Sequence, residues 1–519
     1  MTALAAYEVQ KFNLDGWGGS RQGVADDFFT SYQGNFTTNN PPVGNIQTEN
    51  GLISYFGRLN YSFKDKYLFS ATIRRDGYSA LSATNKFGTF GAVSGGWRIS
   101  EENFFKNLNW EFISDFKLRG SYDTTGNTNI PNFGSLNFFS SGLYGDLATW
   151  VYTQAGNPNL KWESSKKTDV GFDAAFFNNR LTLEFAYYLN NISDLIIGNP
   201  QPPSKGIPGN SILTNIGSMR NRGIEVTVNT VNIDKGGFKW TSSFNLTTNE
   251  NKVLALNQNN ADIQFSTGGL ELTSIARVGF PVGSIFAVPW EGVNPENGRA
   301  MFRLASGRIV QYNHAAPAAS RWTFVDNGQN APAPTANDRI IAGNTNPRFF
   351  GGFDNTLRYR GFDLGIFFQY AFGFYLYNGT RAGLLDQRMW NNSTEVLQRW
   401  RQPGDQTTVP RLVYTDNFSN GSAFAITRNV ERGDFIRLRN ISLGYTLPVD
   451  LLKKLSLTNA RLYAQVQNAF VITNYTGSDP EVSTNSPGLG ATATNIGAGI
   501  DRNTFPQART YSLGVNVTF

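Results

Sequence analysis

The feature that most constrains this chain is the alternation of apolar and polar side chains between Leu52 and Asp76. Because a β-strand sends successive side chains to opposite faces, this segment has one apolar and one polar face. The tripeptide Lys-Asp-Lys at 64–66 separates two alternating runs and predicts an antiparallel hairpin. The residues of the apolar face, which occupy every second position and which we call the apolar parity, are Tyr55, Gly57, Leu59, Tyr61 and Phe63 before the turn and Tyr67, Phe69, Ala71 and Ile73 after it.

The same alternation recurs along the whole chain and predicts about fourteen strands of roughly ten residues, long enough to cross a bilayer at about 45° of tilt. The connections alternate between short and long. A large soluble antiparallel β-protein is the alternative, but it has no reason for this asymmetry, whereas outer-membrane barrels have short periplasmic turns and long extracellular loops. Besides the hairpin, we expect strands near residues 2–12, 87–99, 116–123, 167–176, 181–188, 224–229, 238–246, 349–359, 362–370, 434–447, 461–467 and 511–519.

Several local features refine this transmembrane antiparallel β-barrel. The strand at 434–447 changes phase near Asn440, which predicts a β-bulge. We expect long irregular loops at 15–49, 124–163, 250–345 and 371–433, with an amphipathic helix around Leu385–Trp400 in the last and a short helical connection at 101–112. Aromatic residues near strand ends predict interfacial girdles. They are Phe63, Tyr67, Phe176, Tyr187, Phe238, Tyr359 and Phe362.

Composition agrees with a barrel and excludes other classes. No stretch approaches the roughly 18 to 20 continuous apolar residues of a membrane-spanning helix, so a helical membrane protein is excluded. The mean hydropathy of −0.33 suits a barrel, because lipid-facing and lumen-facing residues cancel along each strand. The chain has no cysteine, which excludes disulfides and thiolate metal sites. A net charge of +6 without basic runs gives little reason to expect nucleic acid as a partner.

The polar face of the strands, which we call the inward parity, carries many charged residues, among them Arg74, Arg119, Asp173, Asp363 and Arg461. Such an interior is too polar to stay dry. We therefore expect it to be filled by water or matched by a plug that pairs these groups.

Several stretches resemble the SusC/RagA-like family of TonB-linked outer-membrane transporters, and they follow one another in family order along almost the whole chain. The resemblance implies a barrel of about 22 strands, filled by an N-terminal plug and preceded by a TonB-contacting box. We expect residues 1–519 to be the C-terminal part of that barrel, without plug domain or signal peptide. The matching stretches include SYFGRLNYSFKDKYLFSATIRRDGYSA, FGTFGAVSGGWRISEENFF, NPNLKWESSKKTDVGFDAAFFNNRLTLEFAYY and DFIRLRNISLGYTLP.

The resemblance also implies a function and partners. Members of this family import oligosaccharides or peptides across the cell outer membrane, each with a surface lipoprotein that resembles SusD. TonB would act through the missing N-terminal region, and outer-membrane lipid would surround the strands. Candidate ligand contacts are loop aromatics, since flat apolar faces stack on sugar rings and apolar side chains; packing within the loops is the alternative role. The candidates are Trp150, Tyr152, Trp322 and Trp390.

Other classes of function are a barrel enzyme, a passive porin and a surface adhesin. The single histidine, His314, lies in a proline- and alanine-rich loop without a G-x-S-x-G motif, so we do not expect an enzyme. The segment Asn294–Gly298 lacks the ligand spacing of an EF-hand and is explained by turn chemistry, so no metal or cofactor is expected. A porin or an adhesin would also suit long loops, and only the family resemblance favours energised import.

The terminal aromatic residue generates a testable prediction. Phe519 closes a strand in which Tyr511, Leu513, Val515 and Val517 are apolar, and a terminal aromatic at this phase resembles the signal read by the outer-membrane assembly machinery. A girdle residue is the alternative. Deleting Phe519 in a full-length protein should lower its outer-membrane abundance several-fold in a fractionation immunoblot. Unchanged abundance would leave only the girdle role.

Overall fold

The computed structural model describes residues 1–24, 26, 28, 31, 36–40, 43–127, 132–257, 259–266, 272–454, 456–481 and 496–519. Parts of the loops expected at 15–49, 124–163 and 250–345 lie outside the described residues. No helix in the described ranges is long and apolar enough to cross a membrane. The chain forms two compact units. Unit one comprises Met1–Gly96, Ser121–Thr168 and Asn191–Ser218, and unit two comprises Trp97–Gly120, Asp169–Asn190 and Met219–Phe519.

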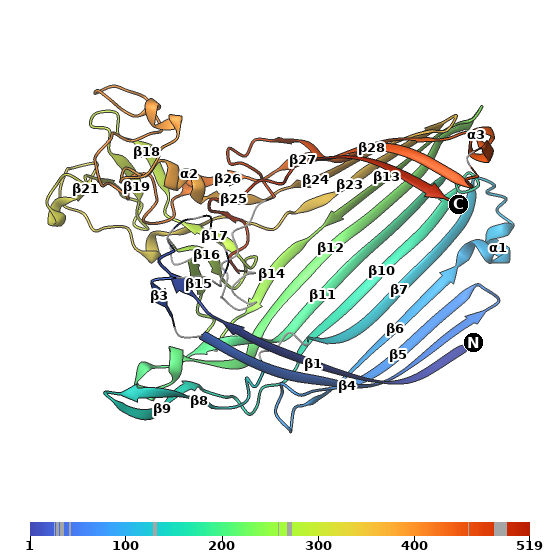
Figure 1. The fold of residues 1–519 in the computed structure, drawn as a ribbon, viewed down its shortest axis with the longest axis horizontal. Coiled ribbons are helices and arrows are strands. Elements are labelled where there is room, and N and C mark those ends of the chain that lie inside the picture. Colours follow the sequence, from blue (N-terminus) through green and yellow to red (C-terminus); the bar gives the residue numbers. More distant parts are fainter. Residues whose placement is uncertain are drawn as a thin grey trace. The chain divides into compact units, whose positions relative to one another are not determined.

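Long strands, hydrogen-bonded in chain order, form one large sheet (Figure 1). In the described residues fourteen strands follow one another along it, and β14 (Glu250–Ala255) pairs with one of them, β12. The all-β class and the strand number expected from the alternation are therefore confirmed. The fourteen are β1 (Thr2–Gly18), β4 (Val43–Phe63), β5 (Tyr67–Tyr78), β6 (Phe87–Arg98), β7 (Ile113–Asn127), β10 (Glu163–Phe176), β11 (Leu181–Pro200), β12 (Ser211–Lys235), β13 (Phe238–Thr248), β23 (Phe349–Tyr359), β24 (Phe362–Phe372), β27 (Phe435–Thr446), β28 (Asn459–Thr473) and β30 (Thr510–Thr518).

The hairpin expected at 52–76 is formed by β4 and β5. Their register pairs Phe63 with Tyr67 across the turn. Lys64 and Asp65 in the turn have φ values of +54° and +50°, a conformation whose twist matches that of the flanking strands. Ile73, on the apolar parity, is 63% exposed. The apolar face is thus turned outward, as a lipid-facing side requires.

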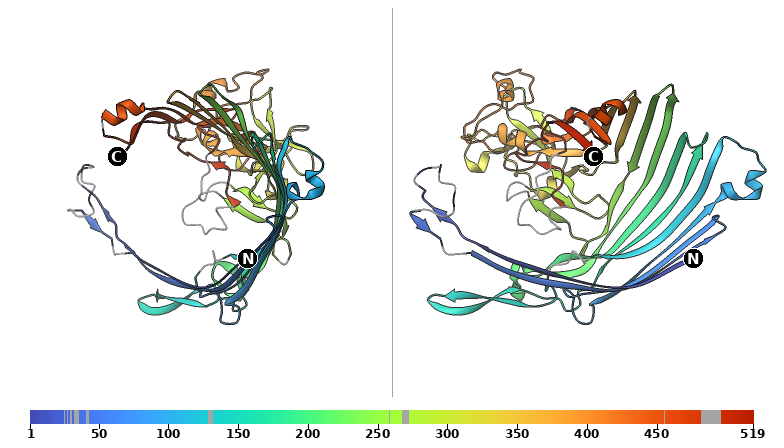
Figure 2. Two further views of the ribbon diagram at one scale, coloured as in Figure 1. Left: turned by 90° about the vertical axis from the view of Figure 1, so that its right-hand side faces the viewer. Right: turned by 45° about the vertical axis from the view of Figure 1, so that its right-hand side comes forward.

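In unit two the connections differ between the two ends of the strands. At one end lie tight turns and two short helices, α1 (Asn103–Lys106) and α3 (Val449–Lys454) (Figure 2). At the other end, the long segments between β13 and β23 and between β24 and β27 fold into small sheets (Figure 1). The expected alternation of short and long connections is present in this unit.

Aromatic rings gather where strands meet the short turns. The rings of Phe63 and Tyr67 stack with centroids 6.4 Å apart, and those of Phe238 and Tyr359 also lie 6.4 Å apart. This arrangement fits the expected interfacial girdle. Tyr187 lies well inside β11 rather than near its end, so the girdle prediction is wrong for this residue.

The bulge expected near Asn440 is present in β27. The register against β28 skips between Leu438 and Asn440, and the register against β24 skips opposite the same step. Arg439 is therefore the extra residue of a β-bulge.

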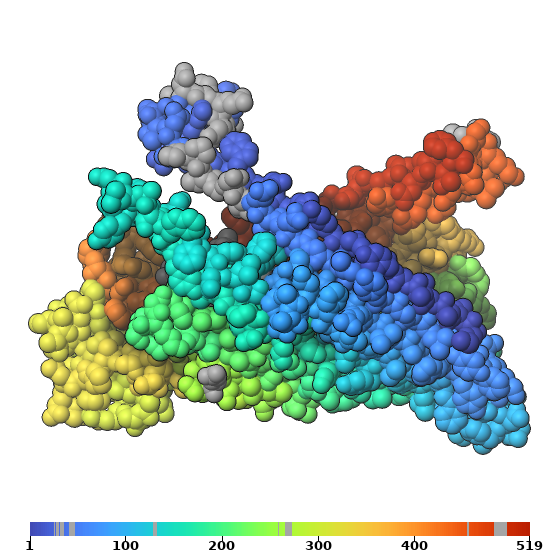
Figure 3. Space-filling view, turned by 90° about the horizontal axis from the view of Figure 1, so that it is seen from below, coloured from blue at the N-terminus to red at the C-terminus, as the bar shows by residue number. Residues whose placement is uncertain are grey.

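Short elements fill the loops, and their number corrects the expectation of irregular structure. The segment 124–163 contains a hairpin of β8 (Phe138–Tyr144) and β9 (Leu147–Gln154), which projects from unit one (Figure 3). The region 250–345 contains two four-stranded sheets whose strands have three to five residues, too few to display an alternation. These sheets consist of β15 (Ile263–Ser266), β16 (Leu272–Ala276), β17 (Ser284–Ala287) and β22 (Ile340–Gly343), and of β18 (Trp290–Val293), β19 (Ala300–Arg303), β20 (Ile309–Tyr312) and β21 (Trp322–Phe324).

The helix expected around Leu385–Trp400 is wrong. The helix α2 (Gly379–Leu384) ends before it, and only the 3-10 turn η7 (Thr394–Gln398) falls inside it. The Asn392 side chain donates to the Leu384 carbonyl at 3.0 Å and the Asp386 carbonyl at 2.8 Å, and such bonds compete with helical backbone bonds. The remaining short elements are β2 (Arg21–Gln22), β3 (Thr38–Asn39), β25 (Tyr375–Asn378), β26 (Val430–Arg432), β29 (Ile500–Asp501), η1 (Ile99–Glu101), η2 (Pro203–Lys205), η3 (Pro208–Asn210), η5 (Ala318–Ser320), η6 (Ala336–Asp338) and η8 (Thr427–Asn429).

Charges of the inward parity pair with one another between strands of unit two. Arg119 of β7 donates to Asp169 at 2.8 Å and to Asp173 at 3.1 Å, both on β10. Arg461 of β28 donates to Asp363 of β24 at 2.8 Å. The sheet itself thus supplies part of the neutralisation that we expected from water or a plug.

Trp162 anchors the core of unit one. Its ring centroid lies 5.4 Å from that of Phe90 and 6.1 Å from that of Tyr78, and its Nε1 donates to the Lys86 carbonyl at 3.0 Å. Gly126 passes so close that a Cβ there would lie 2.2 Å from the Phe90 ring. Any larger residue at Gly126 would displace this aromatic packing.

Replacing Trp162 with Ala should lower the free energy of unfolding by about 3 kcal/mol, because it deletes a buried ring and leaves a cavity. Trp150 is 82% exposed, so Trp150→Ala is the matched control and should change that free energy by less than about 0.5 kcal/mol. Urea unfolding in detergent, followed by the gel mobility of unboiled samples, measures both. Equal destabilisation by the two variants would contradict this assignment of the core.

Candidate ligand-binding loops

The loops of unit two form a folded body that we call the loop module, residues 284–343 and 375–432. Its hydrophobic core lies between the sheet β18–β21 and the later loop: Phe302 and Tyr312 pack with Trp322, Phe424 and Ile426. All five side chains are buried. A loop region with its own core presents a fixed surface.

A second set of contacts ties the module to the segment after β28. Strand β25 pairs antiparallel with β26 and parallel with β29, through Tyr377 and Ile500. The Tyr475 hydroxyl donates to Asp501 at 2.6 Å, and the Thr380 hydroxyl donates to the same carboxylate at 3.1 Å. Loops that are distant in sequence are thereby joined.

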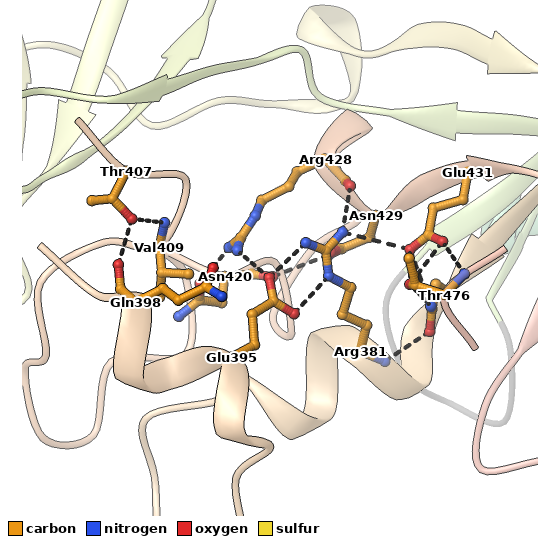
Figure 4. Close-up of polar contacts among 11 residues, drawn as sticks. Arg381, Glu395, Gln398, Thr407, Val409, Asn420, Arg428, Asn429, Glu431 and Thr476 are labelled. Atoms are coloured by element: carbon orange, nitrogen blue, oxygen red, sulfur yellow. Dashed lines mark hydrogen bonds and ion pairs between the residues drawn. The ribbon is translucent and has the colours of Figure 1, made fainter. Parts of the chain in front are cut away.

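An ion-pair network fixes the loop between α2 and β26 (Figure 4). Arg381 donates two hydrogen bonds to Glu395, at 2.6 and 3.0 Å, and Arg428 donates to the same carboxylate at 3.1 Å. Arg428 also donates to the Asn420 side chain at 2.7 Å. On the other side, Arg381 lies 3.5 Å from Glu431. We call these residues the Glu395 network.

Burial sets the electrostatics of this network. The Arg428 side chain is 3% exposed, and burial, together with the charge of Arg381, lowers its pKa to about 10. Burial raises the pKa of Glu395, but the hydrogen bonds and charges of Arg381 and Arg428 outweigh it and hold that pKa below its ordinary value. At neutral pH the Glu395 carboxylate therefore pairs with both guanidinium groups, while Glu431 supplies the second negative charge beside Arg381 and Asn420 accepts from Arg428.

The loop held by this network exposes large apolar side chains. Met389, Trp390, Leu397, Leu412 and Tyr414 all lie on the exposed surface. The ring of Trp390 stands under the Arg388 guanidinium at 5.0 Å. Exposed apolar and aromatic groups on a fixed loop are suited to bind a ligand or a protein partner.

The four aromatic residues proposed as ligand contacts have different environments. Trp150 and Tyr152 lie on β9 of unit one, where Tyr152 donates to Asn137 at 3.0 Å. Trp322 is buried in the core of the loop module, a position that favours packing over ligand contact. Trp390 is exposed on the loop described above. Neither unit brings all four together.

His314 takes part in a structural hydrogen-bond chain. Its Nδ1 lies 2.9 Å from the Tyr312 hydroxyl, and its Nε2 lies 2.8 Å from the Thr415 hydroxyl. These bonds link β20 to the later loop. Among the described residues no group of three or more His, Asp or Glu side chains is placed to hold a metal ion.

A second buried ion-pair group lies on the inward parity of β27. Arg437, whose side chain is 3% exposed, pairs with Asp479 at 2.5 Å and with Glu481. Arg439, the bulge residue, pairs with Glu481 at 2.7 Å. These contacts fasten the segment after β28 to the sheet.

Sequence reasoning did not find the Glu395 network. Its central carboxylate lies 14 residues from Arg381 and 33 residues from Arg428, and no periodicity or motif marks such separations. The one available signal was the presence of several charged residues in a segment expected to be a loop. Phe519 follows β30 and is 91% exposed, and its role in assembly stays a prediction.

Comparisons with known proteins agree on one family. A family model described as "TonB dependent receptor-like, beta-barrel" matches residues 4–326. The chain is 34% identical over 528 residues to TonB-dependent receptor P3 of Formosa agariphila, covering 100% of this chain and 50% of that protein. It is 30% identical over 500 residues to TonB-dependent receptor SusC of Bacteroides thetaiotaomicron, covering 91% and 44%. The chain thus spans about half the length of the curated relatives it matches.

Solved structures agree on the fold. The structure titled "Structure of the RagAB peptide transporter" has a TM-score of 0.80 and 24% sequence identity, covering 100% of this chain and 53% of that one. The RagAB peptide importer in its "open-open" state also has a TM-score of 0.80, at 23% identity, covering 100% and 52%. The arrangement of strands described above is therefore the one found in these transporters.

The Glu395 network generates a prediction about stability. Glu395→Gln leaves Arg428 buried without a negative partner and should destabilise the loop by about 3 kcal/mol. Asp326→Asn, which removes the exposed partner of Arg308, is the control and should cost less than about 1 kcal/mol. Proteolysis of the folded protein in detergent, with cleavage mapped between residues 379 and 431, measures the opening of the loop. Equal protection in both variants would contradict the role of the network.

The same loop should respond to pH. The pKa of Glu395 is lower in the folded protein than in the unfolded chain, where a glutamate carboxyl has a pKa of about 4.3. The ionised Glu395 carboxylate therefore stabilises the folded loop at pH values above about 4.3. This stabilisation is lost as the pH falls through the pKa of Glu395 in the folded protein. Protection of residues 379–431 should therefore fall on acidification below about pH 4.3 in the wild-type protein. Glu395→Gln should show less of this pH dependence.

Proposed function

Because this chain belongs to the family of TonB-dependent receptor-like β-barrels, we propose that it is the barrel part of an outer-membrane importer of the SusC type. Its location is the outer membrane. The proposed importer takes up oligosaccharides or peptides, together with a surface lipoprotein that resembles SusD. We propose these two substrate classes because one relative is titled a peptide transporter and another is named SusC.

The observation that carries the proposal is that the long loops are folded and present a fixed apolar surface. The Glu395 network and the core around Trp322 hold the module, and Trp390 and Tyr414 project from it. A passive porin needs no ordered binding surface on its loops, whereas an importer that selects its ligand does. An adhesin remains the second candidate, since an exposed apolar surface also suits a protein partner.

Energised import requires parts beyond the strands of the sheet. The described residues form strands and the loops between them, and no plug domain is among them. We propose that the plug and the TonB contact are supplied by sequence outside this chain, in keeping with relatives that are about twice as long. Trp150, Tyr152 and Trp390 are the proposed ligand contacts, and Phe519 is the proposed assembly signal.

Uptake by a bacterial strain that lacks its own transporter tests the proposal. The full-length protein should support uptake of a fluorescent peptide or oligosaccharide, and deletion of TonB or of the SusD-like lipoprotein should abolish it. This chain expressed alone should show no TonB-dependent uptake. Uptake by the full-length protein that persists without TonB would favour a passive pore and contradict the proposal.

A further inference from the structure

Two arginines and an asparagine meet at one end of the sheet β18–β21. Strands β19 and β20 pair Met301 with Gln311. Arg299 lies two residues before Met301, and Asn313 lies two residues after Gln311. Because side chains two positions apart point to the same side of a strand, both lie on the face of that pair. The opposite face of this pair carries Phe302 and packs into the buried core. On the polar face Gln311 is buried, and Arg299 and Asn313 at its end are half-buried.

Arg411 joins this end from the later loop. Its backbone N–H donates to the Gly298 carbonyl at 2.9 Å, and its Nη2 donates to the Asn313 side-chain oxygen at 2.7 Å. Gly298 has a φ of +71°, and a Cβ there would lie 2.4 Å from the Trp400 ring and 2.9 Å from the Arg411 Cβ. Trp400 in turn donates from Nε1 to the Pro295 carbonyl at 2.9 Å. These contacts hold Arg411 beside Gly298, the residue that precedes Arg299.

The charges of Arg299 and Arg411 have no acidic partner among the described residues. Within the described part of the chain, neither Arg299 nor Arg411 forms an ion pair, and the Nε of Arg299 is buried without a hydrogen-bond partner. Burial, and then the charge of Arg411, lower the pKa of Arg299. Arginines elsewhere in the same sheet do have acidic partners: Arg303 donates to Glu291 at 2.7 Å, and Arg308 donates to Asp326 at 2.9 Å.

Two like charges near each other without an acidic partner favour the binding of an anion. We propose that Arg299, Arg411 and the amide group of Asn313 form a binding site for an oxyanion, namely a carboxylate or sulfate group. Planar guanidinium groups bind such anions through paired N–H donors. Leu412 and Tyr414, both exposed beside Arg411, would contact an apolar part of the same molecule. That this molecule is the imported ligand rests on the proposed function.

Binding to the purified full chain in detergent tests the site directly. The probes are sodium sulfate and N-acetylglycine, with N-acetylglycinamide as the neutral analogue, titrated calorimetrically at constant ionic strength. The two anions should bind to the wild-type chain and the neutral amide should not. Arg411→Gln and Arg299→Gln should each weaken anion binding about tenfold, whereas Arg299→Lys and Arg411→Lys, which keep the charge, should weaken it less.

Arg308→Gln is the matched control, because it removes an arginine of the same sheet whose partner is Asp326. It should leave anion binding unchanged, and the gel mobility of unboiled samples should show that every variant is folded. Equal binding of the neutral amide, or equal loss in Arg308→Gln and Arg411→Gln, would overturn the proposal.

A carboxylate on the lipoprotein partner is the competing occupant. If neither small anion binds but capture of the SusD-like lipoprotein depends on Arg299 and Arg411, the oxyanion site is wrong and the two arginines serve a protein contact. The titrations require no transport. Failed uptake with intact anion binding would therefore refute the proposed function alone, and intact uptake without anion binding would refute only this site.

Discussion

The constraint on which the structure depends is that backbone groups in a lipid bilayer must find hydrogen-bond partners within the protein. Along the described sheet the strands between β1 and β30 meet it by pairing with a neighbour on each side, and β1 and β30 each pair with one neighbour. The alternation of side chains follows from the same pleat, because the pairing leaves one face for lipid and one for the interior. Ile73 on the first face and Arg119 on the second show the division. The ion pairs of the second face are thus a consequence of the strand geometry.

The loop module is built on different physics from the sheet. Outside the bilayer the hydrophobic effect is available, and the module uses it in the core around Phe302 and Trp322. The buried charged side chains of the module are not stabilised by the hydrophobic effect and need partners of opposite charge. Glu395 and Glu431 pair with Arg381 and Arg428, whereas Arg299 and Arg411 have no such acid in the described residues. The first pair of arginines, with acidic partners inside the module, holds the loop in place. The second pair, without such partners, is left to bind the proposed anion.

The sequence predicted those parts of the fold that repeat a local rule. The hairpin at 52–76, the bulge near Asn440 and the strand count follow from side-chain parity, which the bilayer enforces on every strand. The loops obey no such rule. Strands of three to five residues, such as β21, are too short to show an alternation of apolar and polar side chains. The sequence around Trp322 therefore did not indicate whether this side chain is buried or exposed. The helix expected at 385–400 failed because side-chain bonds from Asn392 compete with the helical backbone.

The parallel pairing of β25 with β29 has a consequence for the order of folding. Tyr377 pairs with Ile500, more than a hundred positions later in the chain, and a contact across such a separation costs more conformational entropy to close than a local one. We therefore expect this pairing to form after the more local pairings within the sheet β18–β21. The loop module is therefore complete only when the segment that follows β28 has joined it.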